Sequence, residues 1–243
     1  MKKLSVITVT YNAQQTLERT LKSVREQSYP HIEHVVVDGK STDGTVELIR
    51  KYNNKKLTWI SEPDKGLYDA MNKAAAMASG DYLCFLNAGD TFFSPETVEK
   101  MMQSFDGDPD ILYGETAIVD DAGKFLHMRR LSAPETLSWK SFKLGMLVCH
   151  QAFIVKRSLF EPYDLQYRFS SDFDWTVRMM KKSKSIHNTH LTLINYLNEG
   201  MTTANRKASL KERYRIMTKY YGGISTFLYH IWFALRAVIK PEK

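Results

Sequence analysis

Val35-Val36-Val37-Asp38-Gly39-Lys40-Ser41-Thr42-Asp43-Gly44-Thr45 decides the fold of this chain. The stretch is a continuous apolar run that stops at a carboxylate and a glycine, which is typical of a buried parallel strand. Tyr82-Leu83-Cys84-Phe85-Leu86-Asn87-Ala88-Gly89-Asp90 has the same form, and a first strand at residues 4–10 runs into Tyr11-Asn12. Open α/β sheets bind ligands at the carboxyl ends of their strands. Asp38, Asp43 and Asp90 therefore predict a site for a polar ligand that is bound together with a divalent cation.

Strands and helices alternate along the chain, which predicts a doubly wound, mostly parallel central sheet. We expect strands at residues 4–10, 32–38, 57–61, 81–87, 150–156 and 186–190. We expect helices at residues 13–27, 43–52, 66–79, 94–105 and 172–182. Ser94-Pro95-Glu96 predicts the start of the fourth helix, with a capping serine and a proline at the first helical position. Residues 111–119 and 124–130 are typical of a hairpin, and residues 134–148 are expected to form a helix and a mobile loop.

Four motifs, in this order, resemble the nucleotide-sugar-binding half of the family 2 glycosyltransferases. They are Ser5-Val6-Ile7-Thr8-Val9-Thr10-Tyr11-Asn12, Val37 to Thr45, Glu62-Pro63-Asp64-Lys65-Gly66-Leu67-Tyr68-Asp69-Ala70-Met71-Asn72-Lys73, and Gly80 to Asp90. The third motif is similar to the bacterial exopolysaccharide enzymes of the colanic acid type. The resemblance covers residues 1 to about 200, and it implies the GT-A fold with a Rossmann-like half that binds a nucleotide diphosphate sugar.

The resemblance implies that Asp38 accepts the imide N–H of a uracil ring, although a solvated cap is the alternative for an acid at a strand end. Thr8, Tyr11 and Asn12 would line the base pocket, and Tyr11 could equally be a buried aromatic residue. Asp43 precedes a helix, so it is at least as well explained as an N-cap.

Asp64-Lys65-Gly66 lies where a helix begins, and the free N–H groups of a helix N-terminus favour phosphate oxygens. Lys65 would add a positive charge to this phosphate site. Asp69 and Asn72 follow at helical spacing, and they either line the sugar pocket or form hydrogen bonds along the helix surface. Met71 stands where many relatives carry an arginine, so no phosphate-contacting arginine is available here.

Asp90 is the candidate metal ligand, and a strand-end cap is its alternative role. The family has an Asp-x-Asp element at this place, whereas Asn87-Ala88-Gly89-Asp90 keeps only the last acid. Mg²⁺ or Mn²⁺ held by this carboxylate, by the diphosphate and by water would offset the charge of the leaving group. We place Asn87 among the donor-binding residues.

Acids in the first turn of the predicted helix 172–182 are either capping groups or the catalytic base. The resemblance implies that Asp172 is the base, with Ser171 where the family has a glutamate, and Asp174 is the second candidate. His150 is a further candidate near the donor sugar, although a lone histidine before a strand is more often structural.

Charge is concentrated at the C-terminus. Residues 206–243 contain nine Lys or Arg and two acidic residues, so this tail accounts for the net charge of +7 of the whole 243-residue chain. Because these basic residues are mixed with bulky apolar ones, they fit a membrane surface better than a nucleic acid.

The run from Ile224 to Ile239 contains His230 and Arg236 and is shorter than the roughly 20 apolar residues of a spanning helix. Its apolar side chains share one helical face, which predicts an amphipathic helix in the membrane interface with Trp232 at headgroup level. The alternative is a helix packed on the core or on a second copy in a homodimer. The predicted face consists of Ile224, Phe227, Leu228, Ile231, Leu235, Val238 and Ile239.

We therefore expect a GT-A domain at residues 1–204, with a donor half (1–110) and an acceptor half (111–204), and a basic helical tail at 205–243. The expected activity is inverting, metal-dependent transfer from a UDP-sugar to a saccharide, polyprenyl-linked at the inner face of the cytoplasmic membrane, in bacterial surface polysaccharide synthesis. Two isolated cysteines and a start without a signal peptide favour the cytoplasm. One alternative is a nucleotidyltransferase, although no glycine-rich loop follows the first strand, and another is a non-catalytic membrane-associated binding protein.

Overall fold

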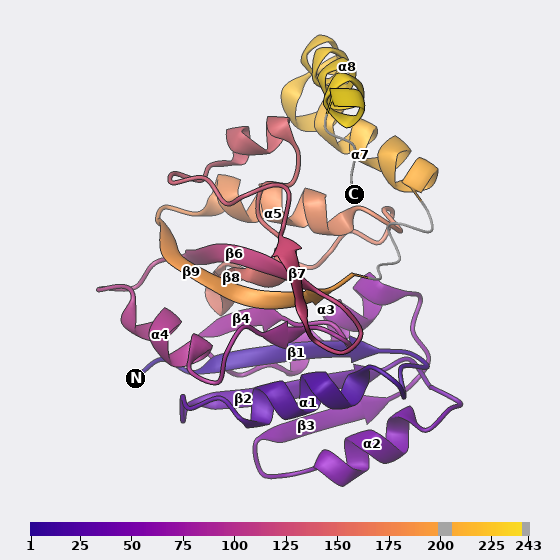
Figure 1. The fold of residues 1–243 in the computed structure, drawn as a ribbon, viewed down its shortest axis with the longest axis vertical. Helices are drawn as coiled ribbons and strands as arrows, with labels where there is room; N and C mark the ends of the chain where they lie inside the picture. The colour runs from indigo at the N-terminus through magenta and orange to yellow at the C-terminus, as the bar shows by residue number, and fades with distance from the viewer. Residues whose placement is uncertain (199–205, 240–243) are drawn as a thin grey trace.

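A computed structural model describes residues 1–198 and 206–239 of this protein, and the side chains of residues 207–235 in its last two helices. Its centre is a nine-stranded sheet of order β3-β2-β1-β4-β8-β6-β9-β5, with β7 paired to β6 (Figure 1). The strands are β1 (Leu4–Thr10), β2 (Ile32–Asp38), β3 (Leu57–Ser61), β4 (Tyr82–Phe85), β5 (Thr91–Phe92), β6 (Ile111–Val119), β7 (Phe125–Met128), β8 (Phe153–Lys156) and β9 (Ile186–Leu197).

Strands β1 to β4 are parallel, as the continuous apolar runs predict. All seven residues of β1 are buried, because β2 and β4 flank it and helices cover both faces of the sheet. The register pairs Thr10 with Asp38, so the two strands end side by side. The predicted donor residues of both strands therefore reach the same edge of the sheet.

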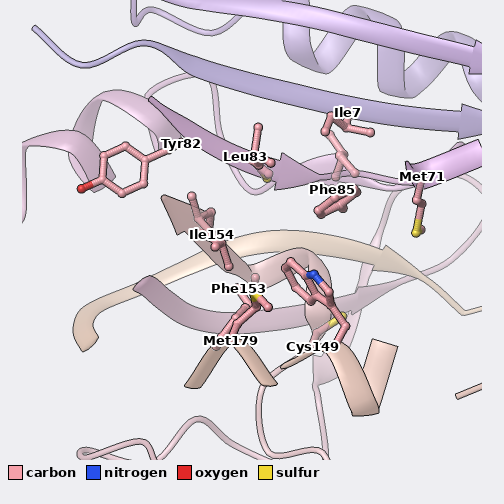
Figure 2. Close-up of a cluster of buried hydrophobic side chains, with 14 of the residues drawn as sticks. Ile7, Met71, Tyr82, Leu83, Phe85, Cys149, Phe153, Ile154 and Met179 are labelled. Atoms are coloured by element: carbon pink, nitrogen blue, oxygen red, sulfur yellow. The ribbon is translucent and has the colours of Figure 1, made fainter. Parts of the chain in front are cut away.

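Successive side chains of β2 point to opposite faces of the sheet, and helices cover both faces. Val36 packs with α1 (Leu17–Arg25) and α2 (Thr45–Tyr52) in a small cluster. Val35 and Val37 belong to a larger cluster with α3 (Leu67–Met77) and α5 (Ser171–Lys182). Figure 2 shows part of this larger core, where Ile7 and Phe85 of the first half lie near Phe153 and Met179 of the second.

The second half of the chain extends the same sheet. β8 pairs antiparallel with both β4 and β6, and β9 runs parallel to β6. The last part of β9 pairs antiparallel with the short β5, where Thr91 faces Asn195. The end of β9 is thereby placed directly beside Asp90.

Several predicted boundaries are wrong for local reasons. α1 begins at Leu17 because residues 13–16 form a turn closed by the Leu17 N–H donating to the Ala13 carbonyl at 2.9 Å. α4 (Thr97–Gln103) begins after Glu96, so Ser94 is not its N-cap. β9 continues to Leu197 although His190, where we expected its end, has a φ of 55°. The strand predicted at residues 150–156 begins only at Phe153, because residues 150–152 form the 3-10 helix η2 (His150–Ala152). The helix predicted within residues 134–148 is the 3-10 helix η1 (Trp139–Leu144).

Two helices, α7 (Arg206–Tyr221) and α8 (Gly223–Ile239), form the C-terminal part. α7 belongs to the packed body of the protein, since Ile216 and Met217 are fully buried. The Glu212 carboxylate accepts the N–H groups of Arg168, Phe169 and Ser170 at 2.8–3.0 Å, immediately before α5. α8 lies beyond α7, at the top of Figure 1. The predicted boundary at 204/205 falls outside the described residues.

Candidate active site

Asp38 is the last residue of β2 and is completely buried. Its carboxylate accepts the Ser41 N–H at 2.9 Å, the Ser61 hydroxyl at 2.6 Å and the Ser41 hydroxyl. An ionised carboxylate offers about four acceptor positions. About one acceptor position thus remains unused, although Asp38 itself does not line the pocket described below.

Asn12 and Asp43 fasten the loops that follow β1 and β2. The Asn12 N–H donates to the Ser41 hydroxyl at 2.8 Å, and its side-chain oxygen accepts the Thr42 N–H at 2.9 Å. Asp43 accepts the N–H groups of Gln14 and Thr45. The hydroxyl and N–H of Thr45 lower the pKa of Asp43 below its usual value. Asp43 therefore holds the turn that precedes α2, and the N-cap residue of this helix is Gly44.

Thr8 lies inside the sheet. Its hydroxyl donates to the Leu86 carbonyl at 2.8 Å and is 2.9 Å from His34 Nε2. Burial lowers the pKa of His34 to about 3, so this imidazole is neutral. Thr8 links neighbouring strands and does not line the pocket described next.

A pocket of about 590 Å³ opens where β1 ends and α3 begins. Tyr11, which is 64% exposed, and Lys65 line it, and so do Tyr68 and Asp69 of α3. The Lys65 N–H already donates to Asp69 at 2.9 Å, and the Gly66 N–H donates to Asp64 at 2.8 Å. Two N–H groups at this helix start are therefore occupied by carboxylates, and the positive groups that line the pocket are the side chains of Lys65 and Arg168.

Asn72 is on the same helix but serves a structural contact. Its amide donates to the Tyr163 carbonyl at 3.0 Å and accepts the Tyr163 N–H at 2.7 Å. It is not among the residues that line the pocket. The Tyr163 ring stacks on Tyr68 with 5.3 Å between ring centroids, which fixes the orientation of Tyr68.

Asp90 is buried and held by groups from distant parts of the chain. One carboxylate oxygen accepts the Gln151 amide at 2.5 Å, and the other accepts the Leu197 N–H at 2.7 Å. Burial raises the pKa of Asp90 to about 6, and these two hydrogen bonds oppose the rise. Gln151 also accepts the Asn87 N–H at 2.7 Å, so one side chain positions both residues.

The donor atoms around Asp90 fit a cation that takes few protein ligands. Among the described residues the side-chain oxygen of Asn87 is buried with no hydrogen-bond partner, and each Asp90 oxygen keeps a second lone pair. Within residues 1–198 and 206–239, no three acidic, histidine or cysteine side chains gather into a metal cluster. One carboxylate and one amide oxygen suit Mg²⁺ or a similar ion that also binds water and phosphate.

Asp172 lies in the first turn of α5, and its side chain is 18% exposed. The Tyr68 hydroxyl donates to it at 3.1 Å, and His150 Nδ1 lies 3.7 Å from its other oxygen. Burial alone would lower the pKa of His150, but the Cys149 thiol and the carboxylates of Asp172 and Asp90 raise it. The structure thus brings together Asp172, His150 and Tyr68, and Tyr68 also lines the pocket.

Asp174 faces a different part of the molecule. It is fully buried and accepts hydrogen bonds from Arg178 at 2.7 Å, Tyr220 at 2.8 Å and Lys219 at 3.1 Å. Burial alone would raise the pKa of Asp174, but these groups lower it. Asp174 joins α5 to α7, so only Asp172 of the two candidates belongs to the cluster with His150 and Tyr68.

Two further residues position the site: Gln151, which the sequence suggested only as the neighbour of His150, and Tyr68, which it did not single out. Both lie within stretches that carry a site residue, directly after His150 and directly before Asp69. Their roles arise from contacts with residues 61 and 104 positions away, Asp90 and Asp172 respectively.

Residues 5–163 match the family Glycosyl transferase family 2. The chain belongs to this family. An uncharacterized glycosyltransferase of Mycobacterium tuberculosis is 36% identical over 182 residues, which cover 72% of this chain and 68% of that protein. A PGL/p-HBAD biosynthesis glycosyltransferase of Mycobacterium bovis is 32% identical over 183 residues, with the same coverage. TuaG of Bacillus subtilis, named for teichuronic acid biosynthesis, is 28% identical over 223 residues, or 86% of this chain and 84% of TuaG.

Solved structures of glycosyltransferases have the same fold. Residues 1–349 of Staphylococcus aureus TarS, in complex with UDP-GlcNAc, align with a TM-score of 0.70 and 22% identity over 88% of this chain. The present chain spans 64% of that TarS chain. The Pyrobaculum calidifontis mannosyltransferase PcManGT, in complex with GDP-Man and Mn²⁺, aligns with a TM-score of 0.66 and 16% identity over 99% of this chain and 76% of its own. The predicted GT-A fold and family 2 membership are confirmed, and this family 2 member is a glycosyltransferase rather than a nucleotidyltransferase.

Proposed function

We propose that this glycosyltransferase is an inverting enzyme that transfers a sugar from a UDP-sugar to a saccharide acceptor in bacterial surface polysaccharide synthesis, of the exopolysaccharide type. The observation that carries the proposal is the Asp172 carboxylate, which is partly exposed, held by Tyr68 and flanked by His150. The UDP-GlcNAc complex of TarS and the teichuronic acid and PGL relatives support the choice of donor and product.

Asp172 is the general base in this reaction. Its carboxylate takes the proton of the acceptor hydroxyl while that oxygen forms a bond to the anomeric carbon. The bond from that carbon to the diphosphate breaks on the opposite face, and its electron pair leaves with the nucleoside diphosphate. The Tyr68 hydroxyl and His150 hold the carboxylate in place, which keeps the base in reach of the acceptor.

The donor occupies the first half of the domain, residues 1–110, and the acceptor occupies residues 111–204. Asp38 and Asn12 lie at the strand ends, and Tyr11, Lys65 and Asp69 line the adjoining pocket. Thr8 and Asn72 act indirectly: Thr8 bonds to the Leu86 carbonyl of the neighbouring strand end, and Asn72 holds Tyr163, which stacks on Tyr68. His150 approaches the site from the second half.

The Asp90 carboxylate and the Asn87 side-chain oxygen would hold Mg²⁺ or Mn²⁺. When bound, such an ion offsets the negative charge that develops on the leaving diphosphate. The Mn²⁺ in the PcManGT complex supports this choice of cofactor.

The C-terminal tail, residues 205–243, binds the inner face of the cytoplasmic membrane through α8. Six apolar side chains of this helix are 44–83% exposed, namely Ile224, Phe227, Leu228, Ile231, Trp232 and Leu235. Tyr229 and Phe233 of the same helix pack against the core. A groove of about 850 Å³ is lined by Ile224, Leu228 and Trp232 together with Leu144. Within residues 1–198 and 206–239, no helix combines the length and hydrophobicity needed to cross a bilayer. The side chains of Arg236, Val238 and Ile239 lie outside the described ones.

Lysines gather near this helix and suit anionic lipid. Lys140, Lys143, Lys181 and Lys219 lie over the rings of Trp139, Tyr220 and Tyr221 at 5.0–5.9 Å. A polyprenyl-linked saccharide would reach the enzyme on the same membrane surface. Alternatively, the apolar face of α8 could bind a second copy of the chain in a homodimer.

The test is the release of nucleoside diphosphate from a panel of UDP- and GDP-sugars, with and without saccharide acceptors. We expect turnover of at least one UDP-sugar, and we expect Asp172→Asn to lower kcat by about 10²- to 10⁴-fold with little change in donor affinity. Full activity of Asp172→Asn would remove Asp172 from the role of base. Turnover of GDP-sugars alone would correct the donor.

A further inference from the structure

Arg213 is a cation of α7 with an incomplete set of partners. It lies outside residues 5–163, the part that matches the family. Its Nε atom is buried, with no hydrogen-bond partner in the described part of the chain. The guanidinium carbon lies 5.5 Å from the centre of the Phe173 ring, and Phe173 directly follows Asp172. Arg213 therefore approaches the candidate base from the C-terminal helix.

The charges around Arg213 do not neutralise it. Burial and the positive charge of Arg129 lower the pKa of Arg213, while Asp172 and Tyr68 act in the opposite direction. Among the described carboxylates, none lies within 4.0 Å of its guanidinium. An arginine stays protonated in proteins, so this site keeps a buried positive charge.

Arg129 is held in place by hydrogen bonds, so it cannot move away from Arg213. Its guanidinium donates to the carbonyls of Met146 at 2.7 Å, Leu131 at 2.9 Å and Leu147 at 3.2 Å. These contacts fix its charge beside the loop that leads to His150. Two cations held near one another favour binding of an anion, because a buried charge is costly unless it is paired.

We propose that Arg213 forms a phosphate-binding subsite beside Asp172, with the fixed charge of Arg129 assisting it. This proposal rests on the proposed function. A planar guanidinium with free N–H groups suits phosphate oxygens, and it can bind two of them at once. Arg213 as a whole is only partly buried, so the subsite is not sealed inside the core. The phosphate is either that of the donor diphosphate or that of a phosphate-linked acceptor.

Three variants test the subsite. Arg213→Met keeps an unbranched stem against Phe173 and removes the charge, and Arg213→Lys keeps the charge without the planar guanidinium. Arg215→Met is the matched control, because Arg215 is an exposed arginine of the same helix. Calorimetry would measure binding of UDP, uridine and inorganic pyrophosphate to the full chain, and kinetics would measure the KM of acceptors with and without a phosphate.

If the donor diphosphate occupies the subsite, Arg213→Met weakens UDP and pyrophosphate binding by about 10- to 100-fold and leaves uridine binding unchanged. If the acceptor phosphate occupies it, UDP binding is unchanged and only the KM of the phosphate-bearing acceptor rises by a similar factor. In either case Arg213→Lys loses less than Arg213→Met, and Arg215→Met matches the native protein.

Unchanged UDP binding and unchanged acceptor KM in a folded Arg213→Met protein would overturn the subsite. Should Arg213→Met fail to fold, Arg213→Lys decides, since native values for both ligands in that variant also overturn it. A native protein that binds neither UDP nor pyrophosphate and shows no preference for a phosphate-bearing acceptor has no such subsite. Failure of the proposed function would be seen separately, as the absence of sugar transfer, because the binding measurements do not require turnover.

Discussion

Asp90 is buried, and its proposed role as a metal ligand requires its charge. Since burial raises its pKa to about 6, the protonated form becomes populated as the pH falls below 6. Protons and a metal ion compete for the same carboxylate. We expect metal-dependent turnover to fall about tenfold per pH unit below about pH 6 and to recover when Mn²⁺ is increased. A pH profile that is identical at low and high Mn²⁺ would count against Asp90 as a ligand.

The same shift affects stability in the absence of metal. The folded pKa of about 6 lies above the usual value of 3.8, so the folded state holds the proton more tightly than the unfolded state. The contribution of this group is complete below about pH 4 and is lost as the pH rises through 6. Urea unfolding in EDTA at pH 4 and pH 7 would measure this contribution by comparison with Asp90→Ala, in which this component of the pH dependence is absent.

Asp90→Ala should also abolish metal-dependent transfer.

Asp172 and Asp174 form a natural pair for comparison, two residues apart on one helix. Asp174→Asn leaves Arg178 and Lys219 facing a neutral amide, and breaking a buried ion pair costs about 3–5 kcal/mol. We expect a large loss of unfolding free energy in this variant, with kcat per folded molecule within a few-fold of native. For Asp172→Asn we expect the opposite, namely a large loss of kcat with little change in the free energy of unfolding. Activity assays and urea unfolding of both variants would check this, and an inactive Asp174→Asn of native stability would exchange the two roles.

The sequence alone could not separate these two acids. Residues i and i+2 of an α-helix point about 200° apart, so one faces the site and the other faces the neighbouring helix. Which face meets the site depends on α7, whose Lys219 and Tyr220 lie 45 and 46 residues further along the chain. The contacts of Gln151 and Arg213 could not be predicted for the same reason, because their partners come from distant segments of the chain.

At the scale of elements, Glu33 joins the starts of three strands. Its carboxylate accepts the Ser5 hydroxyl of β1 at 2.5 Å and the N–H groups of Ser79 and Gly80, which precede β4, at 2.6 and 3.0 Å. Lys3 forms an ion pair with it. Burial alone would raise the pKa of Glu33, but these bonds lower it to about 2.

Glu33→Gln is therefore expected to destabilise the fold by about 2 kcal/mol at pH 7. The folded pKa of about 2 lies below the usual 4.5, so the native protein loses this stabilisation as the pH falls from about 4.5 to 2. Urea unfolding of both proteins from pH 7 downward should show the difference shrinking over that range. A difference that is constant with pH would mean that the charge of Glu33 contributes nothing.

The parallel strands were predictable because their signal is local and continuous. β1, β2 and β3 begin and end at the predicted residues, since each is an apolar run bounded by polar residues. β9 was not predictable in full, because it continues past the positive φ of His190, where its pairing with β6 shifts register before it resumes at Thr192. The start of α4 was missed because Ser94 accepts the Glu96 N–H at 3.3 Å in a turn before the helix instead of capping it.

At the scale of the whole molecule, α8 can be removed without removing α7. Ending the chain after Tyr221 keeps the contacts of Glu212, Lys219 and Tyr220 with α5 and its entry loop. We expect this truncation to release the protein from anionic vesicles and to leave hydrolysis of the donor by water unchanged. Salt should weaken attachment of the full chain, because exposed charges are screened beyond about 10 Å at 0.1 M.

Co-sedimentation with vesicles and light scattering would measure this. Trp232→Ser is a milder variant that removes one exposed apolar side chain of α8, and it should weaken attachment without changing the fold. A truncated protein that still sediments with vesicles would place the membrane contact elsewhere. A truncated protein that changes from dimer to monomer would identify a second copy as the occupant of the α8 face.

The hydrogen bond from the Leu197 N–H to Asp90 spans 107 positions and joins the proposed acceptor half to the proposed donor half. The two halves are therefore not exchangeable modules. A chimera joined near residue 110 would set Asp90 of one parent against the β9 of another, and the carboxylate would lose its backbone donor unless β9 kept its register. Recombination of donor specificity among relatives should instead move Thr91–Phe92 and the end of β9 together with the donor half, as one inherited block.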